Sequence, residues 1–138
     1  MDKPELSNIA ELRDRIRKAG LRSTSARVAV LQNLETATSP LSHADLATAL
    51  APLGFDKATV YRNLKALVDD GTLAVVQLPG ENPRYEPVSR RHHHHFQCTF
   101  CKRVFDVHEC PGNLARLAPK GFTVEHHELT LYGRCDGC

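Results

Sequence analysis

The sequence is poor in aromatic residues. Its 138 residues contain no tryptophan, and aromatic residues make up only 6%. Any core must therefore rest on leucine, valine and alanine. A domain of about 55 residues buries a modest core and often needs a metal, a disulfide or a partner subunit. At 41% hydrophobic and 25% charged residues, the composition is still that of a globular chain, long enough for one ordinary domain or two small ones.

Long hydrophobic runs are also missing. No stretch approaches the roughly 18 apolar residues of a membrane span, and the first ten residues are polar, without the apolar core of a signal peptide. We therefore expect a cytoplasmic protein without a membrane partner. Thiols stay reduced in the cytoplasm, so paired cysteines there are expected to hold metal rather than to form disulfides.

The net charge is only +2, which alone does not favour nucleic acid as a partner. A DNA-binding protein with this balance must concentrate its basic residues locally. One such group lies near the N-terminus and could bind phosphates: Arg13, Arg15, Arg17, Lys18, Arg22 and Arg27.

The first part of the chain has the pattern of a winged helix-turn-helix. Apolar spacing and capping residues predict helices at about 5–19, 24–34, 42–50 and 57–70. A loop is expected at 38–41, and two strands, 72–78 and 84–88, form a hairpin. The fourth helix would enter the major groove, and its Thr59, Tyr61 and Arg62 offer donors, acceptors and a flat ring to DNA. A small helical bundle with an added hairpin is the alternative.

The composition changes at about residue 89, after which lie all five cysteines and seven of the eight histidines. Strands are expected at 96–98, 103–108 and 123–132, with a short helix at 113–118. The fold class is therefore α+β, with a winged helix-turn-helix domain at 1–88 and a second, small domain at 92–138 that carries the metal-ligand residues.

Two cysteine pairs are the strongest chemical signal. Cys98 and Cys101 form one C-x-x-C pair, and Cys135 and Cys138 form the other. Two such pairs complete the tetrahedron that Zn²⁺ prefers and leave no open position for chemistry. The pattern predicts a structural zinc site, with a redox pair as the alternative. The fifth cysteine, Cys110, is interpreted as a small buried residue, a metal ligand or an oxidisable thiol.

The second signal is a run of four histidines, His92 to His95. Alternate side chains on a strand share a face, so His93 and His95 would point one way, and His92 and His94 the other. One run could thus contribute to two metal sites, although a solvated surface strand is the plain alternative. Mixed imidazole and carboxylate ligands suit Fe²⁺, Mn²⁺ or Zn²⁺.

Together these residues resemble the ferric uptake regulator superfamily. The segments that carry the resemblance are GLRSTSAR at 20–27, ATVYRNL at 58–64, HHHHFQCTFC at 92–101 and GFTVEHHELTLYGRCDGC at 121–138. The resemblance implies a metal-responsive repressor that binds a palindromic DNA operator as a homodimer when loaded with metal. It also implies a DNA-binding domain at 1–88, a hinge at about 86–91 and a metal-binding dimerisation domain at 92–138.

The resemblance also implies roles for individual residues. Tyr61 and Arg62 match a DNA-contacting pair, and Arg22 and Arg27 match basic residues that reach DNA. The four paired cysteines match structural zinc ligands. The regulatory metal site would comprise Glu86, His93, His95 and Asp106, and a second site would comprise His92, His94 and His127.

Three departures leave the sensed metal open. Pro40 stands where many members have a regulatory histidine, and the neighbouring His43 is either its substitute or a surface residue at a helix start. His94 replaces the aspartate of many iron sensors, which favours zinc, whereas Asp106 is similar to the peroxide-sensing members. The acidic ligand of the second site has no clear counterpart, and His108, Glu109 and Cys110 are the candidates.

Two other classes of protein fit less well. A metallohydrolase could use the same ligands, but the chain has no HExxH motif and no nucleophile in a recognisable catalytic motif. A metal-storage module would leave the winged-helix pattern unexplained. We therefore expect a regulator and not an enzyme.

Overall fold

The computed structural model describes residues 9–88 and 92–138. The chain forms two compact units, Met1–Arg90 and Arg91–Cys138, each of which is described by itself. Residues 5–8 of the first predicted helix and 89–91 of the predicted hinge lie outside the described residues. None of the helices in the described part is long and apolar enough to cross a membrane.

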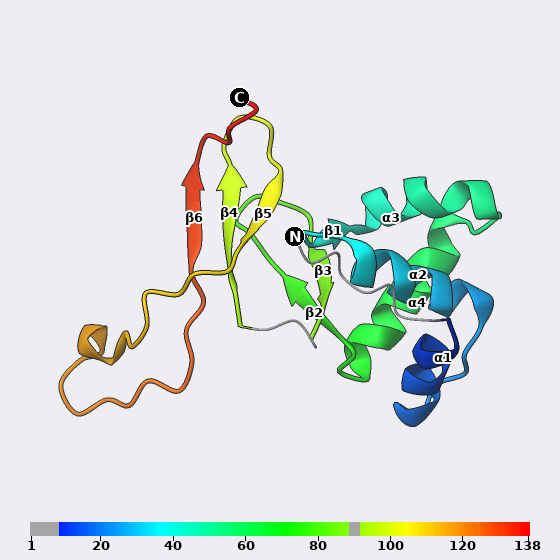
Figure 1. Cartoon of the computed structure of the whole chain (residues 1–138), viewed down its shortest axis with the longest axis horizontal. Coiled ribbons are helices and arrows are strands. Elements are labelled where there is room, and N and C mark those ends of the chain that lie inside the picture. Colours follow the sequence, from blue (N-terminus) through cyan, green and yellow to red (C-terminus); the bar gives the residue numbers. More distant parts are fainter. Residues whose placement is uncertain (1–8, 89–91) are drawn as a thin grey trace. The chain divides into compact units, whose positions relative to one another are not determined.

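The first unit combines helices with a small sheet (Figure 1). Its elements in chain order are α1 (Ile9–Lys18), α2 (Ser25–Thr36), β1 (Leu41–Ser42), α3 (His43–Leu50), a 3-10 turn η1 (Ala51–Leu53), α4 (Lys57–Asp69), β2 (Leu73–Val76) and β3 (Arg84–Pro87). The predicted helix-turn-helix is present as α3 and α4, which pack against each other.

Side-chain caps determine where three of these helices begin. The Thr24 hydroxyl accepts a hydrogen bond from the Arg27 amide at the start of α2, and Asp56 caps α4 in the same way. At α3, Ser42 and Asp45 form the reciprocal capping box that the sequence predicts. Each cap satisfies an amide that has no partner inside its helix.

Leucine and valine fill the core of the first unit, as the lack of aromatic residues requires. The most buried side chains come from all four helices: Leu12, Ile16, Val30, Leu31, Leu34, Leu46, Leu50, Val60, Leu64 and Leu67. Burying one such side chain contributes about 1.5–3 kcal/mol. This core holds α4 in place while its opposite face stays exposed.

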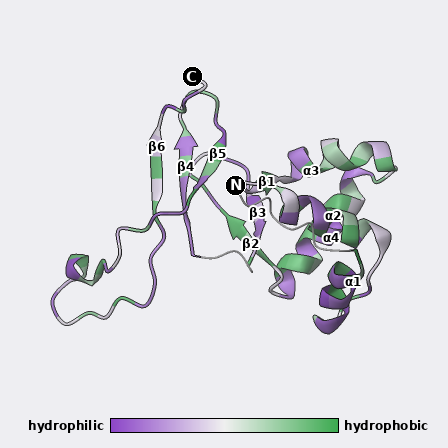
Figure 2. Ribbon diagram, in the orientation of Figure 1, coloured by the Kyte–Doolittle hydropathy of each residue, from purple (hydrophilic) through white to green (hydrophobic). Residues whose placement is uncertain are grey.

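The wing is a three-stranded antiparallel sheet in the order β1-β3-β2. The predicted hairpin is confirmed as β2 and β3, which differ in character: β2 is hydrophobic and β3 hydrophilic (Figure 2). The loop prediction for 38–41 is wrong at its end, because Leu41 pairs with Tyr85 in the two-residue strand β1.

The second unit is a three-stranded sheet with a long irregular segment between its last two strands (Figure 1). Strand β4 (His94–Cys98) lies between β5 (Val104–Val107) and β6 (Thr130–Gly133), antiparallel to β5 and parallel to β6. The strand predicted at 123–132 is wrong for its first part, since pairing with β4 begins only at Thr130. The helix predicted at 113–118 is a single 3-10 turn, η2 (Ala115–Leu117).

Few side chains are buried in this second unit. Among its described residues they are His94, Gln97, Cys98 and Val104. Only one of these four is an aliphatic hydrocarbon side chain. Such a unit cannot be stable through hydrophobic burial alone, and it needs a bound metal or a partner subunit.

Candidate metal centres and nucleic-acid interface

The four paired cysteines meet at one end of the second sheet. Because β4 and β6 are parallel and Cys98 pairs with Gly133, both strands end at the same edge. Cys98 and Cys101 flank the turn after β4, and Cys135 and Cys138 follow β6. Their sulfurs all lie within 4.8 Å of one another, and Cys98–Cys138 and Cys101–Cys135 are each 3.8 Å apart. A tetrahedral zinc with Zn–S bonds of about 2.3 Å separates its sulfurs by about 3.8 Å, so the four residues fit this ion.

Backbone amides prepare this cluster for a cation. The amides of Cys101 and Cys135 each donate to the Cys98 sulfur over 3.4 Å. These hydrogen bonds, that from Cys101 foremost, lower the pKa of Cys98 to about 6. The hydrogen bond with the Cys135 side chain, together with burial, raises the pKa of Cys138. Cys98 is therefore the cysteine that these hydrogen bonds favour as a thiolate ligand, while Cys138 must give up its proton to bind an ion.

His93, His95 and Asp106 form a second cluster on β4 and β5. The antiparallel register places His95 opposite Asp106. The Nε2 atoms of His93 and His95 are 3.1 Å apart, and each lies 3.8 Å from Asp106 Oδ1. Two imidazoles bound to one ion at about 2.0–2.1 Å have nitrogens about 3 Å apart. Two nitrogens and a carboxylate suit Fe²⁺, Mn²⁺ or Zn²⁺.

Glu86, the fourth predicted residue of that site, lies on β3 in the first unit. Its place among the ligands stays a prediction.

The structure also brings the residues of the third predicted cluster together, and Cys110, whose role the sequence left open, lies with them. His92, His94 and His127 lie close together, with ring centroids 4.6 to 5.0 Å apart.

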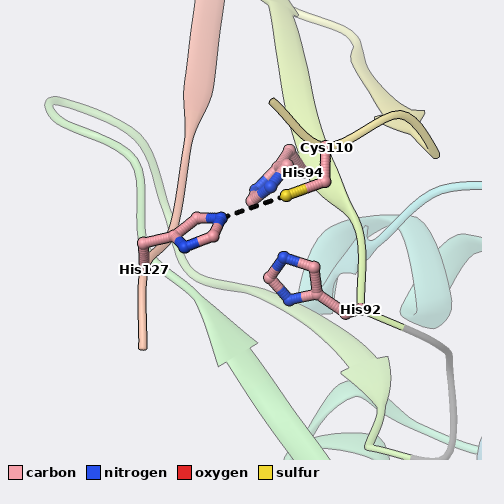
Figure 3. Close-up of side chains that lie close together, drawn as sticks. All are labelled: His92, His94, Cys110 and His127. Carbon is pink, nitrogen blue, oxygen red and sulfur yellow. Dashed lines mark hydrogen bonds between the residues drawn. The ribbon is translucent and has the colours of Figure 1, made fainter. Parts of the chain in front are cut away.

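Cys110 joins these three histidines (Figure 3). Its sulfur lies 3.2 Å from His127 Nε2, and it is exposed, so the interpretation as a small buried residue is wrong. His94 is only 1% exposed, and burial, reinforced by the neighbouring imidazoles, lowers its pKa. The ring is therefore neutral at physiological pH, as a metal ligand must be.

The exposed face of α4 carries the predicted DNA-binding residues. Tyr61 is 51% exposed and Arg62 is also exposed. The Arg62 guanidinium donates to the Thr59 hydroxyl over 3.3 Å, so these two side chains are held next to each other. The face thus presents a cation, a hydroxyl and a ring, groups that can bind phosphates and base edges.

His43 lies beside this face. Its Nε2 is 2.8 Å from the Lys57 carbonyl oxygen, and its ring meets Tyr61 edge-on with centroids 5.5 Å apart. Together with Tyr85 and residues of the wing, they line a pocket of about 410 Å³. His43 thus stands at the start of α3 in contact with Tyr61, and a role as a metal ligand stays a prediction.

Arg27 and Asn63 form a link that sequence reasoning did not find. Arg27 Nε donates to Asn63 Oδ1 over 2.9 Å, and Asn63 in turn donates to the Thr59 carbonyl. Arg27 also donates to the Arg22 carbonyl. Arg27 therefore ties α2 to α4 in addition to its predicted contact with DNA. One feature of the sequence could have revealed Asn63. It is a polar residue that lies beside the apolar stripe of Val60, Leu64 and Leu67, where a buried amide needs a partner.

Known proteins are similar to this chain in sequence and fold. The regulator FurA of Mycobacterium tuberculosis is 31% identical over 96% of this chain and 93% of its own length. The peroxide-responsive repressor PerR of Staphylococcus epidermidis is 29% identical over 89% of this chain and 85% of its own. The structure of the ferric uptake regulator of Francisella tularensis with iron is 27% identical, with a TM-score of 0.74 over 86% of this chain and 95% of its own. The family model of the ferric uptake regulator family matches residues 18–132. The chain therefore belongs to the ferric uptake regulator family.

Proposed function

We propose that the protein is a metal-dependent transcriptional repressor that binds a palindromic DNA operator as a homodimer. The observation that carries this proposal is the cluster of His93, His95 and Asp106, a site for a divalent cation in a chain that also carries an exposed recognition helix. The relatives support it, since they are named as regulators and repressors. We infer a regulator in the cytoplasm and no catalytic role.

The DNA-binding part of the proposal rests on the first unit. Residues 1–88 would bind DNA, with α4 in the major groove and with Thr59, Tyr61 and Arg62 facing it. Arg22 and Arg27, at the start of α2, would bind phosphates. Because Arg27 and Asn63 connect α2 to α4, the phosphate contacts and the recognition helix keep one fixed spacing.

The switch belongs to the second cluster and to the segment before it. Metal bound to His93, His95 and Asp106 would recruit Glu86 from β3, and His43 is a further candidate ligand. Because residues 86–91 connect Glu86 to the histidines, this bond would fix the angle between the domains at 1–88 and 92–138. The ion shifts the equilibrium only if it binds the DNA-competent arrangement more tightly than the other. Fe²⁺, Mn²⁺ and Zn²⁺ all suit these donors.

The dimerisation part of the proposal rests on exposed apolar side chains of the second unit. Phe122 and Leu117 are about 70% exposed, and Leu131 and Tyr132 on the edge strand β6 are also exposed. An edge strand beside exposed apolar side chains is typical of a surface that another chain covers. A second copy would bury them and add the apolar contacts that this unit lacks.

The test measures how tightly the protein binds DNA from upstream of its own gene. Labelled DNA is titrated with protein, and binding is detected by fluorescence anisotropy with and without Mn²⁺, Fe²⁺ or Zn²⁺. We expect metal to strengthen binding in the wild type, and the variants His93→Ala and His95→Ala to lose this response while keeping their fold. His126→Ala is the matched control, because His126 is exposed and lies outside the described clusters. An equal response to metal in all four proteins would refute the proposal.

A further inference from the structure

The cluster of His92, His94, His127 and Cys110 combines three imidazoles with one sulfur donor, and this sulfur affects which metal the cluster would prefer. One nitrogen or sulfur atom from each of the four residues lies within 4.8 Å of the others, a spacing suited to four ligands of one ion. We propose that Cys110 completes a site of three imidazoles and one thiolate for a zinc-class cation. This inference deepens the proposed function by assigning the donors and the metal of its second site.

His94 provides evidence that is independent of the cysteine. It is buried at 1% exposure, and its Nε2 has no hydrogen-bond partner in the described part of the chain. A buried polar atom without a partner destabilises the folded state, so a ligand for this atom is expected. The ring lies beside the Cys110 sulfur and faces His127 (Figure 3).

The hydrogen bond at the other ring nitrogen of His94 should change when a metal binds to this cluster. Nδ1 accepts a hydrogen bond from the Leu129 amide over 3.2 Å, so the neutral ring carries its proton on Nε2. Ligation through Nε2 moves that proton to Nδ1, where it opposes the amide. The Leu129 amide must then find another acceptor.

The donor set separates this site from the cluster on the other face of β4. A thiolate among imidazoles favours zinc, whereas the carboxylate of Asp106 suits the harder Mn²⁺ and Fe²⁺ as well. A cysteine bound to such an ion is a thiolate and a bound histidine is neutral. The histidine run thus serves two sites of different metal preference.

Metal at this site would also fasten a segment that little else holds. No residue from 108 to 129 is buried, and the segment contains no regular element except η2. Cys110 lies near its start and His127 near its end, so a shared ion would attach both ends to β4 next to His94. Closing a loop with a metal removes conformational freedom from the unbound chain. The exposed Leu117 and Phe122 lie between the two attachment points.

Cobalt tests the thiolate directly, because a thiolate bound to Co²⁺ gives a charge-transfer band in the near ultraviolet. The full-length protein is purified with zinc in the four-cysteine site and titrated with Co²⁺ without DNA. We expect the band in the wild type and its loss in Cys110→Ser, which should bind Co²⁺ about tenfold more weakly or worse. His127→Ala should weaken binding, and His126→Ala, the neighbouring exposed histidine, should behave as the wild type.

The proposal is overturned if the wild type shows no such band, or if Cys110→Ser keeps it at full strength. Melting curves by circular dichroism check that the variant is folded, and Cys110 is exposed, so the substitution should be tolerated. As a second measure, the NMR signal of the Leu129 amide should shift when Zn²⁺ fills the site in the wild type, and an unmoved signal contradicts ligation through Nε2. Since no DNA is present, failure here is distinct from failure of the repressor proposal.

Discussion

Asp56 controls the start of the recognition helix. Its carboxylate accepts a hydrogen bond from the Thr59 amide over 2.7 Å, immediately before the residues that face DNA. This interaction with Thr59 lowers the pKa of Asp56 below its usual value of 3.8. Only the ionised carboxylate is a full acceptor at both oxygens, so the strength of the cap depends on pH.

We predict that Asp56→Asn removes this pH dependence. A lowered pKa means that the carboxylate stabilises the folded state fully above pH 3.8 and loses this effect as the pH falls through the folded-state pKa. Asparagine caps helices well but does not titrate in this range. The free energy of unfolding of the wild type minus that of the variant should therefore be constant well above pH 3.8 and fall as the pH drops through 3.8 and below. Urea unfolding measures it, and a constant difference would contradict the assignment.

The individual ligands differ in how far they could be predicted. The spacing of the four paired cysteines predicts their cluster, because four thiolates are enough to bind one zinc ion. Alternation along a strand predicts which histidines lie on each of its two faces. Cys110 could not be placed, because it reaches its cluster from an irregular segment that has no period. Asn63 was missed because its partner, Arg27, lies 36 residues away.

At the scale of elements, capping residues were the most informative signal. Thr24 and Ser42 mark the beginnings of α2 and α3 because their hydroxyl groups act on amides three residues away. Strand limits were less predictable, since a strand needs a partner from elsewhere in the chain. Residues 123–129 have strand-like composition but precede the ladder with β4, which begins at Thr130, whereas β1 pairs with β3 over only two residues.

The capping box of α3 should contribute measurably to stability. Ser42→Ala removes the acceptor for the Asp45 amide and is expected to lower the free energy of unfolding by about 1 kcal/mol. Thr48→Ala is the matched control, because Thr48 is exposed within the same helix and alanine is the better helix former. Urea unfolding compares them; equal stability of the two variants would show that the cap contributes nothing.

At the scale of the whole molecule, the two units depend on different forces. The first unit has a continuous core of leucine and valine. The second has few buried side chains and a cluster of four cysteine sulfurs that could bind a metal ion. A structural zinc site contributes about 10–16 kcal/mol in small peptides, more than the net stability of most domains. The ion is therefore expected to be part of the fold of the second unit.

Zinc removal should unfold the second unit and leave the first intact. After chelation, or in the variant Cys98→Ser, hydrogen exchange should become fast in β4, β5 and β6, while amides of α2 and α4 stay protected. Full protection of the second sheet without zinc would contradict a structural role. Equal loss of protection in both units would show that they fold as one.

The central claim is that metal and DNA binding are coupled, and linkage tests it most directly. If metal strengthens operator binding by a given factor, operator DNA must strengthen metal binding by the same factor, typically about 5–150-fold. The measurement is the affinity for Mn²⁺, followed by electron paramagnetic resonance of the free ion, with and without saturating operator DNA. The account predicts tighter Mn²⁺ binding on DNA in the wild type and no change in His95→Ala. An Mn²⁺ affinity that is the same with and without DNA in the wild type would contradict it.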